Sequence, residues 1–229
     1  MEKRIIAVIG GTGDQGFGLV LRFAKAGEQI IIGSRSQSKA EEAAKKAHRI
    51  LGENVSVVGM DNARAADQAN IIIMSVPFAA HIDMIESIQR SIKANTIFID
   101  VVVPLSTAVG GNSTTALGVW EGSVAQQAAR ILPIKTNVAS AFHNVVAESL
   151  QDLDNEVDCD VIVCSDSQRT RSLVMDLANV IPGVRAIDGG RLENSRIVEH
   201  LTALLIGINI RYKVKHSGMR ITGILPKRI

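Results

Sequence analysis

Aromatic side chains and net charge are both scarce in this 229-residue chain. Phe, Trp and Tyr make up 3% of the residues, and 25 Lys and Arg against 23 Asp and Glu leave a formal charge of only +2. Proteins that bind nucleic acid usually carry a dense basic surface and often present aromatic rings on which bases stack. We therefore expect no nucleic-acid partner.

Cysteine is almost absent as well. Cys159 and Cys164 are the only two, and their spacing matches neither a zinc-binding pair nor a redox-active pair. None of the five histidines stands at the helical spacing from a carboxylate that zinc enzymes use. The sequence thus predicts two reduced, buried thiols and no metal.

The chain also lacks a long apolar segment. The longest apolar run near its end, residues 201–210, is about half the length that crosses a bilayer and is interrupted by Asn209. The beginning of the chain carries no pattern of a signal-peptide cleavage site. We expect a cytoplasmic protein without a membrane partner.

Short runs rich in Ile and Val alternate with segments of helical spacing, which is typical of an α/β fold with a parallel sheet. The predicted strands are 4–10, 29–34, 54–59, 70–76, 96–102, 135–140, 160–164 and 184–188. The predicted helices are 16–26, 38–51, 64–69, 79–92, 168–180 and 195–212. The pattern predicts a doubly wound, mostly parallel Rossmann-type sheet, which the last two strands would extend.

Further expectations concern boundaries. Ser38 and Glu41 have the spacing of a capping box at a helix start. Residues 104–122 are rich in small and turn-forming residues and predict a long loop. Residues 1–190 would form a nucleotide-binding domain, and residues 191–229 a small helical appendage that is irregular over its last 17 residues.

The first predicted strand runs into a glycine-rich turn with the G-x-G-x-x-G spacing of dinucleotide-binding domains. Its first glycine would permit a tight turn, its second would let a pyrophosphate approach the backbone, and its third would let the next helix pack closely. The first amides of that helix would bind phosphate oxygens. The predicted contacts are Gly11, Thr12, Gly13, Asp14, Gln15 and Gly16.

The end of the second strand predicts which dinucleotide binds. NAD-binding domains usually place Asp or Glu there, which accepts a hydrogen bond from the ribose 2′-hydroxyl. This chain instead has Ser34 and Arg35, with Lys39 one helical turn further on. Because a hydroxyl and two cations suit a phosphate group, we predict that NADP is preferred over NAD.

Other candidates follow later strands, at the sheet edge where ligands of open α/β folds bind. Val76, Pro77, Phe78 and Val103 could line the nicotinamide ribose, although the prolines nearby could simply end the strands. His143 could reach the same cleft and donate a proton or orient a cofactor. A purely structural role is the alternative for His143.

The sequence shows no Ser-His-Asp order, no paired carboxylates and no Tyr-x-x-x-Lys arrangement. Reduction of a carbonyl or imine usually needs a proton as well as a hydride, whereas hydride exchange between two cofactors can proceed mainly by positioning. No catalytic acid or base is predicted, and transfer between two cofactors is favoured.

A last motif, Asp188-Gly189-Gly190-Arg191-Leu192-Glu193-Asn194-Ser195-Arg196, is unusual for a generic dinucleotide-binding protein. With the glycine-rich turn and the segment Gly33-Ser34-Arg35, it makes the chain resemble the F420-dependent NADP oxidoreductases over essentially its whole length. The resemblance implies direct hydride transfer between NADP(H) and the deazaflavin coenzyme F420, and a homodimer to which the apolar helix near the chain end could contribute.

The resemblance also implies roles for individual residues. Residues 12–15 would contact the pyrophosphate, Ala147 the nicotinamide side and Thr222 the deazaflavin. Phe78 departs from the tryptophan of family members, Asn144-Val145-Val146 departs from a proline-containing stretch, and residues 226–229 are additional. These departures concern the second substrate more than NADP.

Two other functions are weighed against this one. A reductase of a small imine would have a long helical C-terminal dimerisation domain, which the short segment after Gly190 does not supply. A non-enzymatic NADP sensor would need a partner surface or tail that the sequence does not display.

Overall fold

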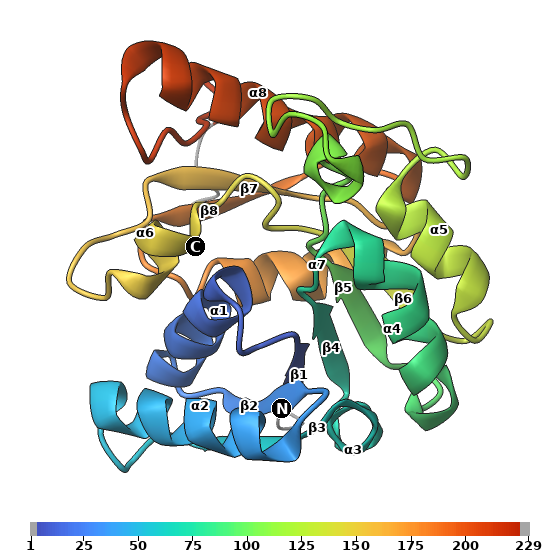
Figure 1. Cartoon of the computed structure of the whole chain (residues 1–229), viewed down its shortest axis with the longest axis vertical. Coiled ribbons are helices and arrows are strands. Elements are labelled where there is room, and N and C mark those ends of the chain that lie inside the picture. Colours follow the sequence, from blue (N-terminus) through green and yellow to red (C-terminus); the bar gives the residue numbers. More distant parts are fainter. Residues whose placement is uncertain (1–3, 225–229) are drawn as a thin grey trace.

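A computed structural model describes residues 4–224 of the chain. Its main sheet has six parallel strands in the order β3-β2-β1-β4-β5-β6 (Figure 1). These strands are β1 Ile5–Ile9, β2 Gln29–Ser34, β3 Val57–Asp61, β4 Ile71–Met74, β5 Ile97–Asp100 and β6 Asn137–Ser140. The order is that of a doubly wound Rossmann sheet, so the predicted fold class is confirmed.

Helices cover both faces of this sheet, because its strands bury apolar side chains on both sides. In β1, Ile6 and Val8 pack into one core with α1 and α2, while Ala7 and Ile9 pack into the other with α3, α4 and α5. The helices are α1 Asp14–Lys25, α2 Gln37–Leu51, α3 Asn62–Gln68, α4 His81–Ile88, α5 Val124–Ile131, α6 Ala147–Gln151, α7 Gln168–Ala178 and α8 Ser195–Tyr212.

The third strand lies two to three residues later in the chain than predicted. The strand runs from Val57 to Asp61 rather than over residues 54–59, and its last residue pairs with Ser34 at the end of β2. Because β3 is an edge strand with few buried side chains, its apolar pattern is weak. Helix α3 consequently begins at Asn62, at the carboxyl edge of the sheet.

The last two strands do not extend the main sheet as predicted. β7 Cys159–Val163 and β8 Val184–Asp188 form a separate two-stranded parallel sheet. A single antiparallel bridge between Ser140 and Cys164 connects it to β6. The chain enters this region antiparallel to β6, so a continuous parallel ladder does not form.

The capping box predicted for the second helix is wrong. The helix begins at Gln37, so Ser38 lies inside its first turn, and Ser36 is the N-cap residue. Glu41 accepts a hydrogen bond from the Gln37 side chain at 2.8 Å instead of one from a capping amide. The sequence prediction also omitted the short helices α5 and α6.

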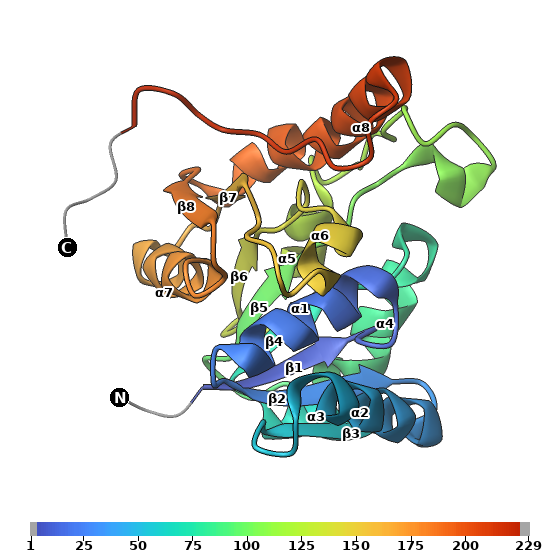
Figure 2. The same cartoon turned by 90° about the vertical axis from the view of Figure 1, so that its left-hand side faces the viewer.

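Helix α8 lies across one end of the molecule, beside the segment 104–122, and the chain then returns along β7 and β8 (Figure 2). As predicted, residues 104–122 are irregular apart from one 3₁₀ turn at Ser106–Val109 and one bridge between Leu105 and Ala116. Residues 213–224 have no regular element, and the remainder of the predicted irregular end lies outside the described residues. Within residues 4–224, no helix is both long and apolar enough to cross a bilayer.

Candidate functional site

The turn after β1 owes its shape to Gly10 rather than to Gly11, which we had predicted for the tight turn. Gly10 has φ +80°, and a Cβ there would lie 2.2 Å from the Ser75 carbonyl oxygen. Both constraints demand glycine. Gly11 is also confined, since its Cβ would lie 2.8 Å from the Val8 oxygen.

The other two glycines of the motif differ in what confines them. A Cβ on Gly16 would lie 2.6 Å from the Gly10 oxygen, so this glycine lets α1 pack on the turn. A Cβ on Gly13 would meet only the Gly10 oxygen, at an ordinary 3.5 Å, and the residue is exposed. The protein itself therefore does not require glycine at position 13, which leaves the backbone open to a close-approaching ligand.

A cavity of about 530 Å³ opens between the glycine-rich turn and the ends of β2, β3 and β4. Ser34 is largely buried, whereas Arg35 and Lys39 are exposed. Among the described residues, the lining of this cavity contains those two cations and no carboxylate. The lining residues are Gly10, Thr12, Gly13, Ser34, Arg35, Ser36, Lys39, Asn62, Ser75, Val76, Pro77, Ala80 and Met84.

A second cavity of about 460 Å³ adjoins the first, because Gly13, Ser75, Val76 and Pro77 line both. It extends from the start of α1 to the ends of β4 and β5, and its wall is largely apolar. Its other lining residues are Asp14, Gln15, Gly16, Phe78, Ala79, Val101, Val102, Val103, Leu105, Thr107 and Ala108. The two cavities together suit a dinucleotide, with the 2′-phosphate beside the cations and the pyrophosphate at the helix start.

His143 lies elsewhere than predicted. It follows β6 but lines neither of these cavities; it borders a cavity of about 250 Å³ together with Thr202 and Ser217. His143 as a whole residue is 4% exposed, and neither ring nitrogen has a hydrogen-bond partner among the described residues. Burial lowers the pKa of His143 to about 4, so the ring is neutral at physiological pH.

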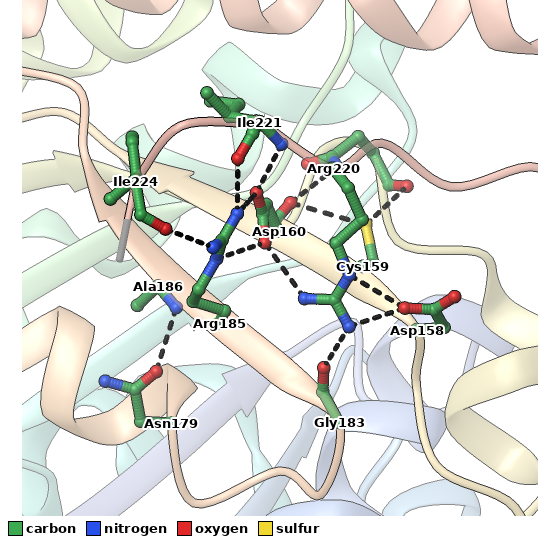
Figure 3. Close-up of polar contacts among 11 residues, drawn as sticks. Asp158, Cys159, Asp160, Asn179, Gly183, Arg185, Ala186, Arg220, Ile221 and Ile224 are labelled. Carbon is green, nitrogen blue, oxygen red and sulfur yellow. Dashed lines mark hydrogen bonds and ion pairs between the residues drawn. The ribbon is translucent and has the colours of Figure 1, made fainter. Parts of the chain in front are cut away.

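Ala147 and Thr222 also lie apart from the two cavities. Ala147 begins α6, which packs on α1. Thr222 is exposed and follows Ile221, whose amide donates a 2.6 Å hydrogen bond to Asp160 (Figure 3). Their predicted cofactor contacts stay predictions.

Polar contacts hold the segment that carries Thr222. The buried Asp160 carboxylate accepts hydrogen bonds from the guanidinium groups of Arg185 and Arg220, at 2.6–2.9 Å (Figure 3). Burial alone would raise the pKa of Asp160, but these donors and the Ile221 amide outweigh burial and lower it to about 2. The segment around Arg220 and Ile221 is thus fixed to the two-stranded sheet.

Sequence reasoning missed several lining residues, of which Asn62 is the most informative. Its signal was available, because residues after a parallel strand gather at the ligand-binding edge. The misplaced end of the third strand concealed this signal, since the predicted strand ended at Gly59 and the real one at Asp61.

Comparison with known proteins agrees with this geometry. Residues 5–104 match the family described as NADP oxidoreductase coenzyme F420-dependent. A protein of Methanocaldococcus jannaschii named F420-dependent NADP reductase is 48% identical over 96% of this chain and 98% of its own. The chain belongs to the F420-dependent NADP oxidoreductase family. A relative of the same name in Methanothermobacter thermautotrophicus is 46% identical over 96% of this chain and 95% of its own.

Solved structures show the same fold. A crystal structure from Arthrobacter sp. FB24, provisionally named an F420-dependent NADP-reductase, superposes with a TM-score of 0.80 at 21% identity and covers 96% of this chain and 99% of that one. A reductive aminase from Aspergillus terreus gives a TM-score of 0.61 at 13% identity, covering 92% of this chain but 63% of that one. The family's fold therefore spans this chain, whereas the aminase has a substantial part without a counterpart here.

Proposed function

We propose that this protein transfers hydride between NADP(H) and the deazaflavin coenzyme F420. The observation that carries the proposal is the pair of adjoining cavities: the first has two cations and no carboxylate, and the second is largely apolar. The first environment suits an adenosine end that carries a 2′-phosphate, and the second suits a nicotinamide ring, which is uncharged in its reduced form. The relatives' name, F420-dependent NADP reductase, supports F420 as the second reactant.

In this proposal the chain's residues bind and orient NADP. Arg35, Lys39 and the Ser34 hydroxyl hold the 2′-phosphate, and residues 12–15 hold the pyrophosphate at the start of α1. Val76, Pro77, Phe78 and Val103 exclude water around the nicotinamide, where hydride is given or taken. The Asp14 carboxylate also lies at this helix start, but it is exposed and can point into solvent, away from the pyrophosphate.

The hydride passes from C4 of the nicotinamide to C5 of the deazaflavin, and the proton that completes the reduced deazaflavin comes from solvent, so no side chain has to supply a proton at the two reacting carbons. A neutral, buried His143 suits a positioning role beside the smaller cavity better than a role as a proton reservoir. We propose that the deazaflavin ring stacks on the nicotinamide so that hydride passes directly, with Ala147 on the nicotinamide side and the segment carrying Thr222 contacting the deazaflavin. Residues 1–190 then form the nucleotide-binding domain, and residues 191–229 complete the second-substrate site.

A spectrophotometric assay tests the proposal. Purified protein mixed with NADPH and oxidised F420 should bleach the visible absorbance of the deazaflavin. Omission of either reactant is the control. Intact NADPH binding without bleaching would contradict F420 as the acceptor and would favour an imine substrate or an NADP-sensing role.

We also propose a homodimer whose interface includes α8. Ile197 and Leu204 are 59% and 53% exposed on this helix and, with Leu201, line a shallow groove. Isolated apolar residues are common on surfaces, but a row at helical spacing is typical of an interface. A cytoplasmic location is proposed as well, because both cysteines are unpaired and buried.

A further inference from the structure

Asn62 is the first residue of α3 and borders the adenosine end of the larger cavity. The residue is 8% exposed, and its Nδ2 donates to the Met84 sulfur at 3.1 Å. Its Oδ1 is buried and has no hydrogen-bond partner among the described residues. An unpaired buried acceptor destabilises the folded protein, because the hydrogen bonds it made with water are not replaced. A ligand that supplies a donor at this wall would remove that destabilisation.

The position of Asn62 identifies the part of the ligand involved. Ser34 pairs with Asp61, so Asn62 follows directly beside the end of β2, where Rossmann domains bind the adenosine ribose. A Cβ on Gly33 would lie 2.9 Å from Asn62 Oδ1. The glycine therefore leaves room for the amide at the ribose-binding edge.

The chemistry of the site explains why an amide suits this position. Every charged group in the cavity lining is a cation, so the lining lacks the carboxylate that accepts from ribose hydroxyls in NAD-binding domains. An amide oxygen accepts a hydrogen bond without repelling a neighbouring phosphate. The adjacent carboxylate of Asp61 instead accepts from the Arg64 amide at 3.0 Å and does not border the cavity.

We propose that Asn62 is a specificity-determining residue that accepts a hydrogen bond from the free 3′-hydroxyl of the 2′-phosphorylated ribose. The inference rests on the proposed binding of NADP. Asn62 borders the cavity, and a turn of its amide about the broad terminal torsion, which exchanges the contact with Met84 for one with the ligand, would direct Oδ1 toward the ribose. The residue thereby replaces the acidic ribose-binding residue of NAD enzymes with a neutral one that tolerates the 2′-phosphate.

Calorimetric titration with two ligand fragments tests this role. The probes are adenosine 2′,5′-bisphosphate and its 3′-deoxy counterpart. We expect wild-type protein to bind the hydroxylated probe about five- to tenfold more tightly, the range of one neutral hydrogen bond. In Asn62→Leu this preference should disappear, while Asp61→Asn, a matched change next to the site, should retain it.

Asn62→Asp provides a second variant in case Asn62→Leu fails to fold. It keeps an acceptor, so the 3′-hydroxyl preference should persist, but its charge should weaken binding of the bisphosphate more than binding of adenosine 5′-monophosphate. Equal wild-type affinities for the two probes, or a preference that survives in Asn62→Leu, would overturn the inference.

Two further outcomes separate the inference from its premise and from an adenine contact. No wild-type binding of adenosine 2′,5′-bisphosphate would contradict the NADP proposal itself. The adenine contact is tested with a bisphosphate probe in which unsubstituted purine replaces adenine. If wild-type protein binds the adenine probe more tightly, Asn62→Leu abolishes this preference and the 3′-hydroxyl has no effect, the assignment to the ribose would be overturned.

Discussion

At the scale of single residues, the site depends on two cations near its opening and on the lack of carboxylates among the described residues that line it. Arg35 and Lys39 stand at the mouth of a cavity whose lining has no carboxylate. The sequence was sufficient to predict these cations, because Arg35 directly follows a strand with a strong apolar pattern and Lys39 lies one helical turn further on. The sequence was not sufficient to predict Asn62 as a lining residue, because the strand before it has a weak apolar pattern. It was also not sufficient to predict the burial of His143, because the residues around that side chain come from the distant helix α8.

Replacement of Arg35 by alanine should weaken NADPH binding by about 1–3 kcal/mol, since a charged hydrogen bond to phosphate is lost. Affinity for NADH should change little, because NADH lacks that phosphate. Fluorescence titration of both nucleotides measures the difference, with Arg49→Ala at the far end of α2 as control. An unchanged NADPH affinity would place the 2′-phosphate elsewhere.

Replacement of His143 by alanine should slow hydride transfer with little loss of NADPH affinity, because the imidazole borders a cavity separate from the nucleotide cleft. Since burial lowers its pKa to about 4, the wild-type rate should show no ionisation of this ring between about pH 5.5 and 8. Rate measurements over that range, with the exposed His216→Ala as control, check both points. An inflection that His143→Ala removes would show a titrating catalytic histidine.

At the scale of elements, the predictions succeeded where local pattern dominates. The central strands β1, β2 and β4 bury nearly every side chain and were recognised from their runs of Ile and Val. Helix α6 was missed because it has a single turn, and its support is tertiary: the buried Arg22 guanidinium donates to the carbonyl oxygens of Ser149 and Leu150. Such long-range contacts leave no periodicity in the sequence.

The contacts of Asp160 predict how firmly the segment around Arg220 and Ile221 is held. Asp160→Asn should destabilise the protein by about 2–4 kcal/mol, because two guanidinium groups lose a buried partner. Asp158→Asn is the matched control: that carboxylate is 88% exposed beside Arg220, and its loss should cost less than about 1 kcal/mol.

The lowered pKa of Asp160 also predicts that its contribution to stability depends on pH. The pKa of Asp160 is lowered in the folded state to about 2, so its contribution is complete above its unfolded pKa and is lost as the pH falls toward 2. The stability difference between wild type and Asp160→Asn, from denaturant titrations, should therefore shrink between about pH 4 and pH 2. A difference independent of pH would contradict this assignment.

At the scale of the whole molecule, the chain combines a complete Rossmann sheet with a smaller two-stranded sheet and a terminal helix. The fold class followed from sequence because strand and helix patterns alternate along the chain. The separation into two sheets could not be predicted from the sequence. It depends on the antiparallel direction in which the chain meets β6 at the Ser140–Cys164 bridge, and residue composition does not reveal that direction.

The exposed row on α8 predicts the oligomeric state. Leu204→Glu should convert a homodimer into a monomer, because a charge in an apolar interface is costly. Leu173→Glu on α7, a leucine that is 37% exposed, is the matched control and should stay dimeric. Sedimentation of both variants and of wild type checks this, and a wild-type monomer would refute the interface.

The most direct test of the account follows the hydride itself. NADPH carrying deuterium at both C4 positions of the nicotinamide is mixed with the protein and oxidised F420 in ordinary water, and the reduced deazaflavin is examined by mass spectrometry. Direct transfer between two bound cofactors predicts reduced F420 that carries the deuterium. Reduced F420 without deuterium, or no reduction despite bound NADPH, would contradict the account.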